Sequence, residues 1–290
     1  MPLVGKAVAH GAVTVINAIS CGFGAALGVD LKTEAKVRLT NEPGRIEGRI
    51  LSDPKESTLL IEKTVNRVLE SLGLQEEYGA LVETKSNIPI ARGLKSSSAA
   101  ANAVALAVSA ALKKEVSDLA LVNLGVDAAI DAGVTVTGAF DDACASYFGD
   151  IVITNNYERT VLKQYYLEEK HPVLIHVPSE KAYTAKSDVE RMRLVADEVK
   201  ALHKMAHLGE YWVAMTLNGL VYSTVLGYDT NIALDALAAG ALASGLSGKG
   251  PSVAAVVPRD IVGNVREAWK KYGGDIIVTR VNSEKAHTAS

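Results

Sequence analysis

Cysteine and aromatic residues are scarce in this sequence, and neither sign of charge dominates. The 290 residues contain 2 cysteines and 5% aromatic residues, and the formal net charge is −3. The absence of a C-x-x-C pair and of a Cys/His cluster excludes a disulfide framework and a structural zinc site, and the lone cysteines predict a cytoplasmic protein. Interspersed charges and few aromatics argue against nucleic acid or a membrane surface as a partner. We therefore expect a small-molecule substrate.

Long apolar runs are also missing. The longest uncharged stretch, Ala7–Val29, is interrupted by His10, Asn17, Ser20 and glycines. It therefore forms neither a continuous membrane span nor the core of a signal peptide. Since 48% of the residues are hydrophobic, the chain can bury a sizeable core without a metal or a disulfide.

Hydrophobic periodicity predicts an α+β fold, because runs of strands and runs of helices occur without strict alternation. Strands are predicted at Ala7–Ile19, Val29–Leu39, Arg45–Leu51, Ala80–Glu83, Ile151–Thr154, Val161–Tyr166, Val173–Val177, Val253–Val257 and Ile276–Arg280. Helices are predicted at Ser57–Leu72, Ser96–Leu112, Asp118–Ala132, Val189–His207, Tyr211–Leu226, Asn231–Ala243 and Ile261–Lys271. We expect a tight turn at Cys21–Gly28 and little regular structure in Val134–Phe148. A composition shift at Asn155-Asn156 predicts two domains, 1–155 and 156–290.

The strongest chemical signal is Pro89–Ala101, where a glycine-containing loop runs into three serines at the start of an alanine-rich helix. Unpaired N–H groups and the positive dipole end at a helix N-terminus bind phosphate, and serine hydroxyls can reach a metal ion or an oxyanion. Capping is the common use of serine there, but one serine is enough to cap a helix. Three serines behind Gly93-Leu94-Lys95 therefore favour an anion-binding site.

A second glycine-rich segment, Gly245–Ser252, precedes an apolar strand. It is not a P-loop, since G-x-x-x-x-G-K-[ST] requires glycine at Ala243 and Ser or Thr at Gly250. Two interpretations remain open. The segment is either a flexible loop that approaches a phosphate or the first loop, or a plain helix-to-strand turn.

Asp141 and Asp142 lie side by side in an otherwise apolar, small-residue segment, Thr137–Gly149. A carboxylate in apolar surroundings is costly unless it is paired, bound to metal or used in catalysis. Such a group can position or deprotonate a hydroxyl, or complete a magnesium shell. The pair favours a functional role over an aspartate-containing turn.

Three weaker signals favour structural roles. His203 and His207 have metal-ligand spacing, but Lys204 stands where a zinc protease has glutamate, which indicates a solvated helix face. Cys144 has no histidine nearby in sequence and is typical of a small core residue. The glycines of Gly22–Gly28 precede a strand-like segment, which is the wrong context for a dinucleotide-binding turn.

The three motifs, in this order, resemble those of the GHMP kinases, the superfamily of galactokinase and of homoserine, mevalonate and phosphomevalonate kinases. Pro89–Ser97 is similar to the phosphate-binding second motif and Gly245–Ser252 to the third, and Asp141 occupies the position of the catalytic aspartate. Within the superfamily, Ala91–Asn102 and Thr137–Ser146 are most similar to the archaeal-type shikimate kinases. The resemblance spans nearly the whole chain.

The resemblance implies a two-domain α+β fold with an N-terminal mixed sheet and a C-terminal ferredoxin-like sandwich. It implies ATP-dependent phosphorylation of a small-molecule hydroxyl, with shikimate giving shikimate 3-phosphate. Asp141 is then the catalytic residue that orients or deprotonates the hydroxyl, and Ser97 and Asp131 hold magnesium. ATP is then bound by Pro89, Ile90, Ala91, Arg92, Gly93, Leu94, Lys95, Ser96, Ser97, Ser98, Ala99, Gly248 and Gly250.

The sequence also departs from the superfamily pattern. His10-Gly11-Ala12 stands where many members have Pro-Gly-Arg or Pro-Gly-Lys, so a basic role there is absent or is supplied elsewhere, with Lys6 as a candidate. Lys95 replaces a common glycine and adds a charge near the phosphates. No glutamate matches the superfamily's magnesium ligand, and Asp131 is the nearest substitute before Asp141.

Several alternatives remain open at this point. The acceptor could instead be homoserine or mevalonate. Candidates for binding an acceptor carboxylate are the basic residues Lys181, Lys186, Arg191 and Arg193. From other classes, a nicotinamide-dependent oxidoreductase would use Gly22–Gly28 as its phosphate turn, and a ligand sensor would bind nucleotide without turnover. The oligomeric state is also open, a homodimer included.

Overall fold

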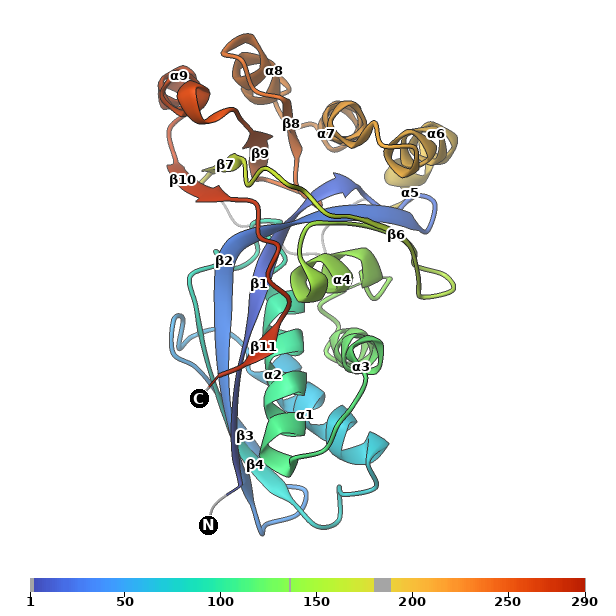
Figure 1. Ribbon diagram of the computed structural model, residues 1–290, viewed down its shortest axis with the longest axis vertical. Helices are drawn as coiled ribbons and strands as arrows, with labels where there is room; N and C mark the ends of the chain where they lie inside the picture. Colours follow the sequence, from blue (N-terminus) through green and yellow to red (C-terminus); the bar gives the residue numbers. More distant parts are fainter. Residues whose placement is uncertain (1–2, 136, 180–188, 290) are drawn as a thin grey trace.

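The N-terminal region forms a long mixed sheet (Figure 1). The computed structural model describes residues 3–135, 137–179 and 189–289. The strands of this first sheet are β1(Val4–Ile16), β2(Phe23–Thr40), β3(Ile46–Ile50), β4(Gly79–Ser86), β5(Ile151–Asn155), β6(Thr160–Tyr165) and β11(His287–Thr288). The order is β11-β1-β2-β4-β3, with β3 and β4 parallel and the other neighbours antiparallel. β5 pairs with the first residues of β2, and β6 pairs with β5.

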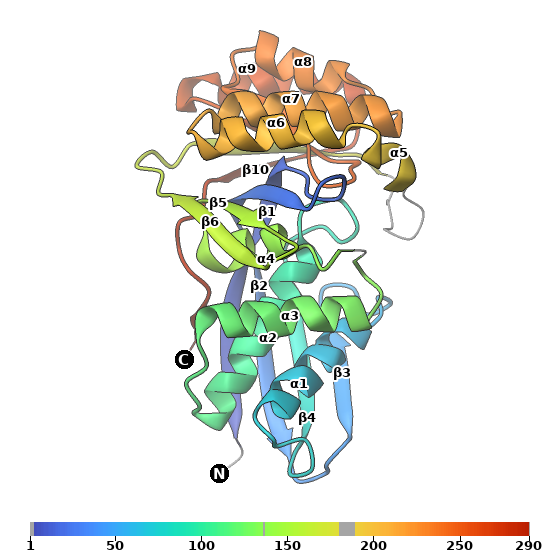
Figure 2. The ribbon, with the colours of Figure 1, turned by 90° about the vertical axis from the view of Figure 1, so that its right-hand side faces the viewer.

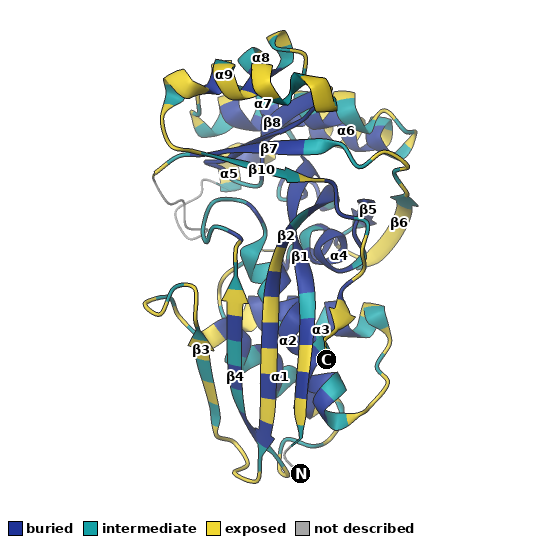
Figure 3. Cartoon of the chain, turned by 60° about the vertical axis from the view of Figure 1, so that its left-hand side comes forward, coloured by how far each residue is buried: buried dark blue, intermediate teal, exposed yellow. Residues whose placement is uncertain are grey.

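One face of this sheet is covered by helices and the other is open. The helices are α1(Leu59–Ser71), α2(Ser96–Leu112), α3(Asp118–Asp131) and α4(Phe140–Phe148). On β2, burial alternates strictly from Leu31 to Leu39, because Leu, Thr, Ala and Val face the helices while lysine, glutamate and arginine face solvent (Figure 3). Small residues let α2 pack closely on β1: a Cβ at Gly5 would lie 2.0 Å from Ala107 O.

A second, antiparallel sheet lies above the first sheet. Its strands are β7(Pro172–Val177), β8(Ala243–Leu246), β9(Val253–Val256) and β10(Asp275–Arg280), in the order β10-β7-β9-β8. The helices of this region are α5(Val189–Arg193), α6(Ala196–His207), α7(Tyr211–Leu226), α8(Asn231–Ala238) and α9(Val262–Trp269). In Figure 2, α6 to α9 form a layer over the far face of the sheet. This strand order and one-sided helix layer confirm the predicted ferredoxin-like sandwich.

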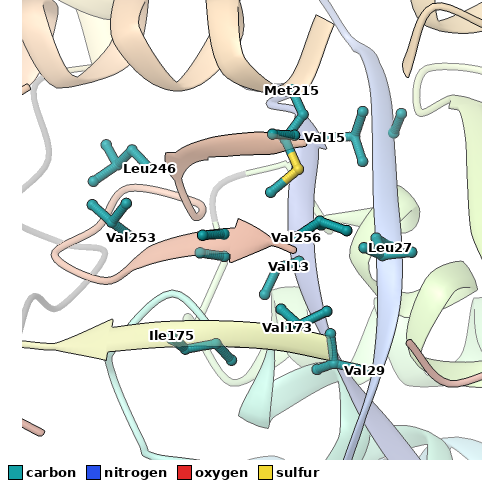
Figure 4. Packing of buried hydrophobic residues seen from close by; sticks show 14 of the residues in the cluster. Val13, Val15, Leu27, Val29, Val173, Ile175, Met215, Leu246, Val253 and Val256 are labelled. Carbon is teal, nitrogen blue, oxygen red and sulfur yellow. The ribbon is translucent and has the colours of Figure 1, made fainter. Parts of the chain in front are cut away.

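The near face of the second sheet packs on the ends of β1 and β2 that extend beyond α2. One apolar cluster joins the two sheets (Figure 4). Its members include Val13, Val15, Leu27, Val29, Val173, Ile175, Leu246, Val253 and Val256. This junction brings the loops of the second sheet close to the start of α2.

Most predicted elements occur, and α2 and α7 begin and end at the predicted residues. Several local predictions are wrong. The single helix predicted over Val189–His207 is divided into α5 and α6. Phe23–Gly28 begins β2 instead of forming a turn, because these small residues pair with β5. The segment predicted to be irregular contains α4, and Ala243–Leu246, predicted as helix end and loop, is the buried strand β8.

The predicted boundary after Asn155 falls between β5 and β6, which are hydrogen-bonded neighbours in the first sheet. The composition shift marks a hairpin turn rather than a linker. The chain passes to the second sheet between Tyr165 and Pro172, and its last described residues return to the first sheet as β11. None of the helices within the described ranges is long and apolar enough to cross a membrane.

Candidate active site

A cavity of about 160 Å³ opens where the two sheets meet. Its lining comes from the end of β1, the loop before α2, the first turn of α2, the loop before α4 and the loop after β8. The predicted site residues in this lining are Ala91, Gly93, Leu94, Lys95, Ser96, Ser97, Ser98, Asp141, Gly248 and Gly250. The fold therefore gathers the three sequence motifs around one small cavity.

The first turn of α2 presents unpaired N–H groups to this cavity. Lys95 precedes the helix in a left-handed conformation, and no side chain caps the helix. Ala99 N–H donates to Lys95 O (3.0 Å). The N–H groups of Ser96, Ser97 and Ser98 are those that a helix leaves without partners, and all three residues line the cavity. The serines do not cap the helix, and its start is free to bind an anion.

The two glycine-rich loops touch beside this helix. Ser247 Oγ donates to Gly93 O (2.7 Å), and Gly248 N–H donates to Thr14 Oγ1 (2.8 Å). Gly93 has a φ of +79°, and a Cβ there would lie 2.2 Å from Ser247 O, so the close approach needs glycine. Of the two interpretations of the second glycine-rich segment, the one in which it approaches the first loop is confirmed.

Asp141 faces the cavity from the first turn of α4. The residue is 4% exposed, and its Oδ1 accepts a hydrogen bond from Asn156 Nδ2 (2.7 Å). Burial, reinforced by the charge of Asp142 and opposed by that of Lys95, raises the pKa of Asp141 to about 7. β2 passes so close that a Cβ at Gly24 would lie 2.5 Å from Asp141 Oδ2. The result is a fixed carboxylate whose pKa suits a general base.

Two lysines bring positive charge to the same cavity. Lys95 Nζ pairs with Asp142 Oδ1 at 2.9 Å, and the Lys95 side chain is 7% exposed. Lys249 also lines the cavity, and burial, together with the charge of Lys95, lowers its pKa to about 8. The cavity thus combines helix N–H groups, ammonium groups and a buried carboxylate, which is a setting for polyanionic ligands.

A more apolar cavity of about 320 Å³ adjoins the first. The two cavities share Ala91, Ser96, Ser97 and Val134. Apolar side chains from β3 and the start of α1 contribute to its walls: Ile50, Leu59, Leu60 and Ile61. A ligand with a charged end and a flat apolar end can therefore lie across both cavities.

Several predicted ATP-binding residues do not line the first cavity. Pro89 and Arg92 line a separate cavity near β7 and β10, where Arg92 Nη2 donates to Ser179 O (2.5 Å). Ile90 lines the apolar cavity, and Ala99 is fully buried behind the helix start. This hydrogen bond links the loop before α2 to the segment that follows β7.

Asp131 lies apart from the other predicted magnesium ligand, Ser97. Both of its carboxylate oxygens accept hydrogen bonds from Arg67, at 2.6 Å from Nε and 2.8 Å from Nη2. The Arg67 guanidinium holds the pKa of Asp131 below its usual range. Asp131 is not in the lining of the first cavity. Across residues 3–135, 137–179 and 189–289, no group of three or more His, Cys, Asp and Glu side chains is placed to hold a metal ion.

The weaker sequence signals have structural explanations. His203 is buried, with its ring centroid 5.2 Å from that of Phe23, so the expected solvated face is wrong for this residue. Cys144 is fully buried, as predicted. Gly24 and Gly28 lie in β2, where a Cβ at Gly28 would lie 2.9 Å from Gly149 Cα. Close packing explains these glycines, and they form no dinucleotide-binding turn.

The site also contains residues that carry no clear signal in the sequence. Thr14 and Asn17 bind the backbone of Gly248, and the sequence shows them only as part of an apolar strand. Asn156 is fifteen residues from Asp141 and lies in a segment marked only by a shift in composition. Lys249 stands inside the predicted loop, where a lone positive charge among glycines is the available signal.

A helix N-terminus, buried ammonium groups and a fixed carboxylate around one cavity define a site for phosphoryl transfer. The family model described as GHMP kinases N terminal domain matches residues 60–150, and the model described as GHMP kinases C terminal matches residues 199–275. A shikimate kinase from Methanosarcina mazei is 47% identical over 288 residues, covering 99% of this chain and 97% of that protein. One from Pyrococcus furiosus is 43% identical, covering 92% of this chain and 96% of that protein.

Solved structures agree on the fold. Homoserine kinase from Cytophaga hutchinsonii is similar with a TM-score of 0.78 and 22% identity, covering 100% of this chain and 98% of that chain. Mevalonate kinase from Methanococcus jannaschii gives a TM-score of 0.77 and 18% identity, covering 96% and 98%. The chain belongs to the GHMP kinase family. It is an ATP-dependent kinase.

Proposed function

We propose that this kinase phosphorylates shikimate with ATP and releases shikimate 3-phosphate and ADP. The observation that carries the proposal is the buried carboxylate of Asp141, which faces the same cavity as the free N-terminus of α2. The acceptor follows from relatives named shikimate kinase that are 39–47% identical over nearly the whole chain. Because the helix start binds anions and the carboxylate binds a hydroxyl, the two features supply both halves of a phosphoryl transfer.

The triphosphate of ATP lies against the N–H groups of Ser96, Ser97 and Ser98. Lys95 and Lys249 line the same cavity and neutralise the negative charge that the phosphates carry. The nucleoside occupies the adjoining apolar cavity, which shares Ser96 and Ser97 with the phosphate site. Its volume of about 320 Å³ and apolar walls suit a purine ring better than a charged group.

Asp141 orients the acceptor hydroxyl and accepts its proton. The hydroxyl oxygen forms a bond to the γ-phosphorus, the bond from that phosphorus to the bridging oxygen breaks, and ADP leaves with the electron pair. Asp141 Oδ1 accepts a hydrogen bond from Asn156 Nδ2, and among the described residues no side chain donates to Oδ2. Oδ2 is therefore the oxygen available to the substrate. Because the transition state is loose, most of the acceleration comes from positioning and charge neutralisation.

Magnesium enters this proposal as part of the substrate, bound to the phosphates of ATP. The donor set fits such an ion, because Mg²⁺ with ATP needs few protein ligands beside phosphate oxygens and water. Ser97 offers a hydroxyl in the phosphate cavity. Asp131 would first have to leave Arg67, so Ser97 is the protein ligand that we retain. The ion supplies charge neutralisation at the phosphates.

The acceptor lies beside Asp141 in the cavity, whose lining also includes Asn17, Ala18 and Ile19. Of the basic residues considered for its carboxylate, Lys181 and Lys186 lie outside the described residues. Arg191 and Arg193 are exposed on α5. Homoserine and mevalonate stay the alternative acceptors.

The compartment and assembly are part of the same proposal. Both cysteines, Cys21 and Cys144, are buried and free, which suits a reducing cytoplasm. Light scattering of the purified protein tests whether it is the homodimer that the sequence leaves open.

A coupled ADP-release assay with ATP and magnesium tests the function against shikimate, homoserine, mevalonate and galactose. We expect turnover with shikimate alone. Turnover with another acceptor keeps the kinase and overturns the substrate. Binding of ATP without turnover on any acceptor would indicate a nucleotide sensor, and fluorescence quenching on titration with NADPH would indicate the oxidoreductase alternative.

A further inference from the structure

Within the described chain, one side chain donates a hydrogen bond to the carboxyl group of Asp141, and this donor is the neutral amide of Asn156. Asn156 Nδ2 lies 2.7 Å from Asp141 Oδ1, and Thr154 Oγ1 lies 2.7 Å from Asn156 Oδ1. All three residues are buried, with exposed fractions of 4%, 8% and 0% for Asp141, Asn156 and Thr154. An amide has one accepting end and one donating end. Because the Thr154 hydroxyl donates to Asn156 Oδ1, the NH₂ group of Asn156 faces the carboxylate of Asp141.

Backbone pairing fixes this arrangement. Thr154 is the register partner of Gly24 in the β2–β5 ladder, and Asn156 N–H donates to Gly22 O (2.8 Å). Gly24 is also the residue whose missing Cβ makes room for Asp141 Oδ2. The donor and the surface against which the carboxylate rests therefore come from the same pair of hydrogen-bonded strands.

No cationic side chain takes this place in the described part of the protein. Lys95 makes its ion pair with Asp142. The sequence suggests Lys6 as a basic residue for this role, but Lys6 lies opposite Lys36 in the β1–β2 ladder. β1 reaches the cavity at Thr14, which is eight residues after Lys6 and four after His10. At 3.3 Å per residue, eight residues of strand place Lys6 roughly 26 Å from Thr14.

We propose that Asn156 is a positioning residue for phosphoryl transfer, held by Thr154 so that it fixes Asp141 with Oδ2 directed at the acceptor hydroxyl. This inference rests on the proposed kinase reaction. The neutral amide orients the carboxylate without forming an ion pair, so Asp141 keeps the proton affinity needed to accept the hydroxyl proton. A cation at the same place would hold the carboxylate equally well and weaken it as a base.

The test compares Asn156→Ala and Thr154→Val with Thr154→Ser and the matched control Asn155→Ala. Asn155 Oδ1 accepts from the backbone of Tyr157, so the control alters the same turn without touching Asp141. We expect kcat to fall about 100-fold in Asn156→Ala and about tenfold in Thr154→Val, with KM for both substrates within about twofold, because misplacing a reacting group slows chemistry without weakening binding. We expect Thr154→Ser, which keeps the hydroxyl, to have nearly the kcat of the parent.

The pH dependence of kcat separates positioning from a general structural role. The charged groups that face Asp141 are Asp142 and Lys95. Three other titratable groups interact with it and stay neutral near pH 7, because burial raises their pKa values: Cys21, Cys144 and Tyr222. Removing the donor in Asn156→Ala, or freeing the amide to turn in Thr154→Val, moves the acid limb of the profile to higher pH. The control leaves it in place.

Unchanged kcat in both variants, or a higher KM at unchanged kcat, overturns the proposal. A lower kcat with an unmoved acid limb also overturns it, since the loss would then reflect folding. A second measurement needs no acceptor: the pKa of Asp141 is followed from the pH dependence of unfolding, with and without Asn156→Ala. If the enzyme fails to phosphorylate any acceptor but this pKa still rises, the reaction is wrong and the contact is right.

Discussion

Replacing Asp141 with asparagine is expected to stabilise the protein while removing its activity. The pKa of the carboxyl is raised from 3.8 to about 7, mainly by burial. Folding therefore binds a proton between these two pH values, and the stability contributed by this group falls as pH rises from about 4 to about 7 and is level above that. A shift of about 3 units corresponds to about 4 kcal/mol, which the ionised carboxylate costs the folded state at pH 8.

Asparagine has nearly the same shape, and its oxygen can still accept the hydrogen bond from Asn156, so the cavity is not disturbed. We expect Asp141→Asn to melt about 7 °C higher than the parent at pH 8 and at nearly the same temperature at pH 4. Thermal scans at both pH values measure this, and the ADP-release assay on the same samples should show a loss of at least about 1,000-fold in kcat with ATP affinity unchanged.

Asp131→Asn is the matched control, because Asp131 is a carboxylate whose pKa is lowered by Arg67. Its removal should lower stability slightly and leave turnover intact. If the melting temperatures of Asp141→Asn and the parent differ by the same amount at every pH, then burial does not perturb this carboxylate and the reasoning fails. Turnover near the parental level in Asp141→Asn would remove Asp141 from the mechanism.

Three further predictions follow from the cavity. Lys249 has a pKa of about 8 and loses its proton as pH rises, so kcat/KM for ATP should fall above about pH 8. Lys249→Arg should move this fall to higher pH. If the fall stays at the same pH in Lys249→Arg, another group causes it. Gly24→Ala places a Cβ 2.5 Å from Asp141 Oδ2 and should lower kcat at least about tenfold while the Kd of ATP in equilibrium titrations stays the same; a weaker Kd would show a wider disturbance. Ser97→Ala should raise the magnesium concentration needed for half-maximal rate, whereas an equal effect of Asp131→Asn would restore Asp131 as a ligand.

The sequence alone predicts an element or a site residue when the residues that determine it lie in one short segment of the chain. α2 is predicted to the residue because the three serines and the long alanine-rich stretch are local features of one segment. The acidic pair Asp141-Asp142 in apolar sequence is also a local signal, and the resemblance to the GHMP kinases selects Asp141 from this pair. By contrast, α4 has few periodic apolar positions of its own, and it is helical because Phe140, Cys144 and Tyr147 pack into the core of the first sheet.

The parts of the site that escaped prediction depend on pairing between distant strands. Asn156 reaches Asp141 only because β5 pairs with the start of β2. Asp131 was a reasonable magnesium ligand by its distance from Asp141 along the chain, but helix α3 directs it to Arg67 on α1. Arg92 precedes the helix start, as a phosphate ligand should, yet its side chain reaches across to Ser179. A sequence pattern gives residue types and spacing, and the direction of a side chain depends on neighbours far along the chain.

The return of the last residues to the first sheet has a consequence for how the protein is made. β11 adds to the edge of β1, and Val281 bridges to Val29. While a ribosome is still producing the second sheet, the strand edge that β11 covers is bare and open to pairing with other nascent chains. The usual order, in which an N-terminal unit finishes folding before the next is synthesised, does not apply here. The second sheet is complete once β10 has been made, whereas the edge of the first sheet is covered only after synthesis has passed Thr288.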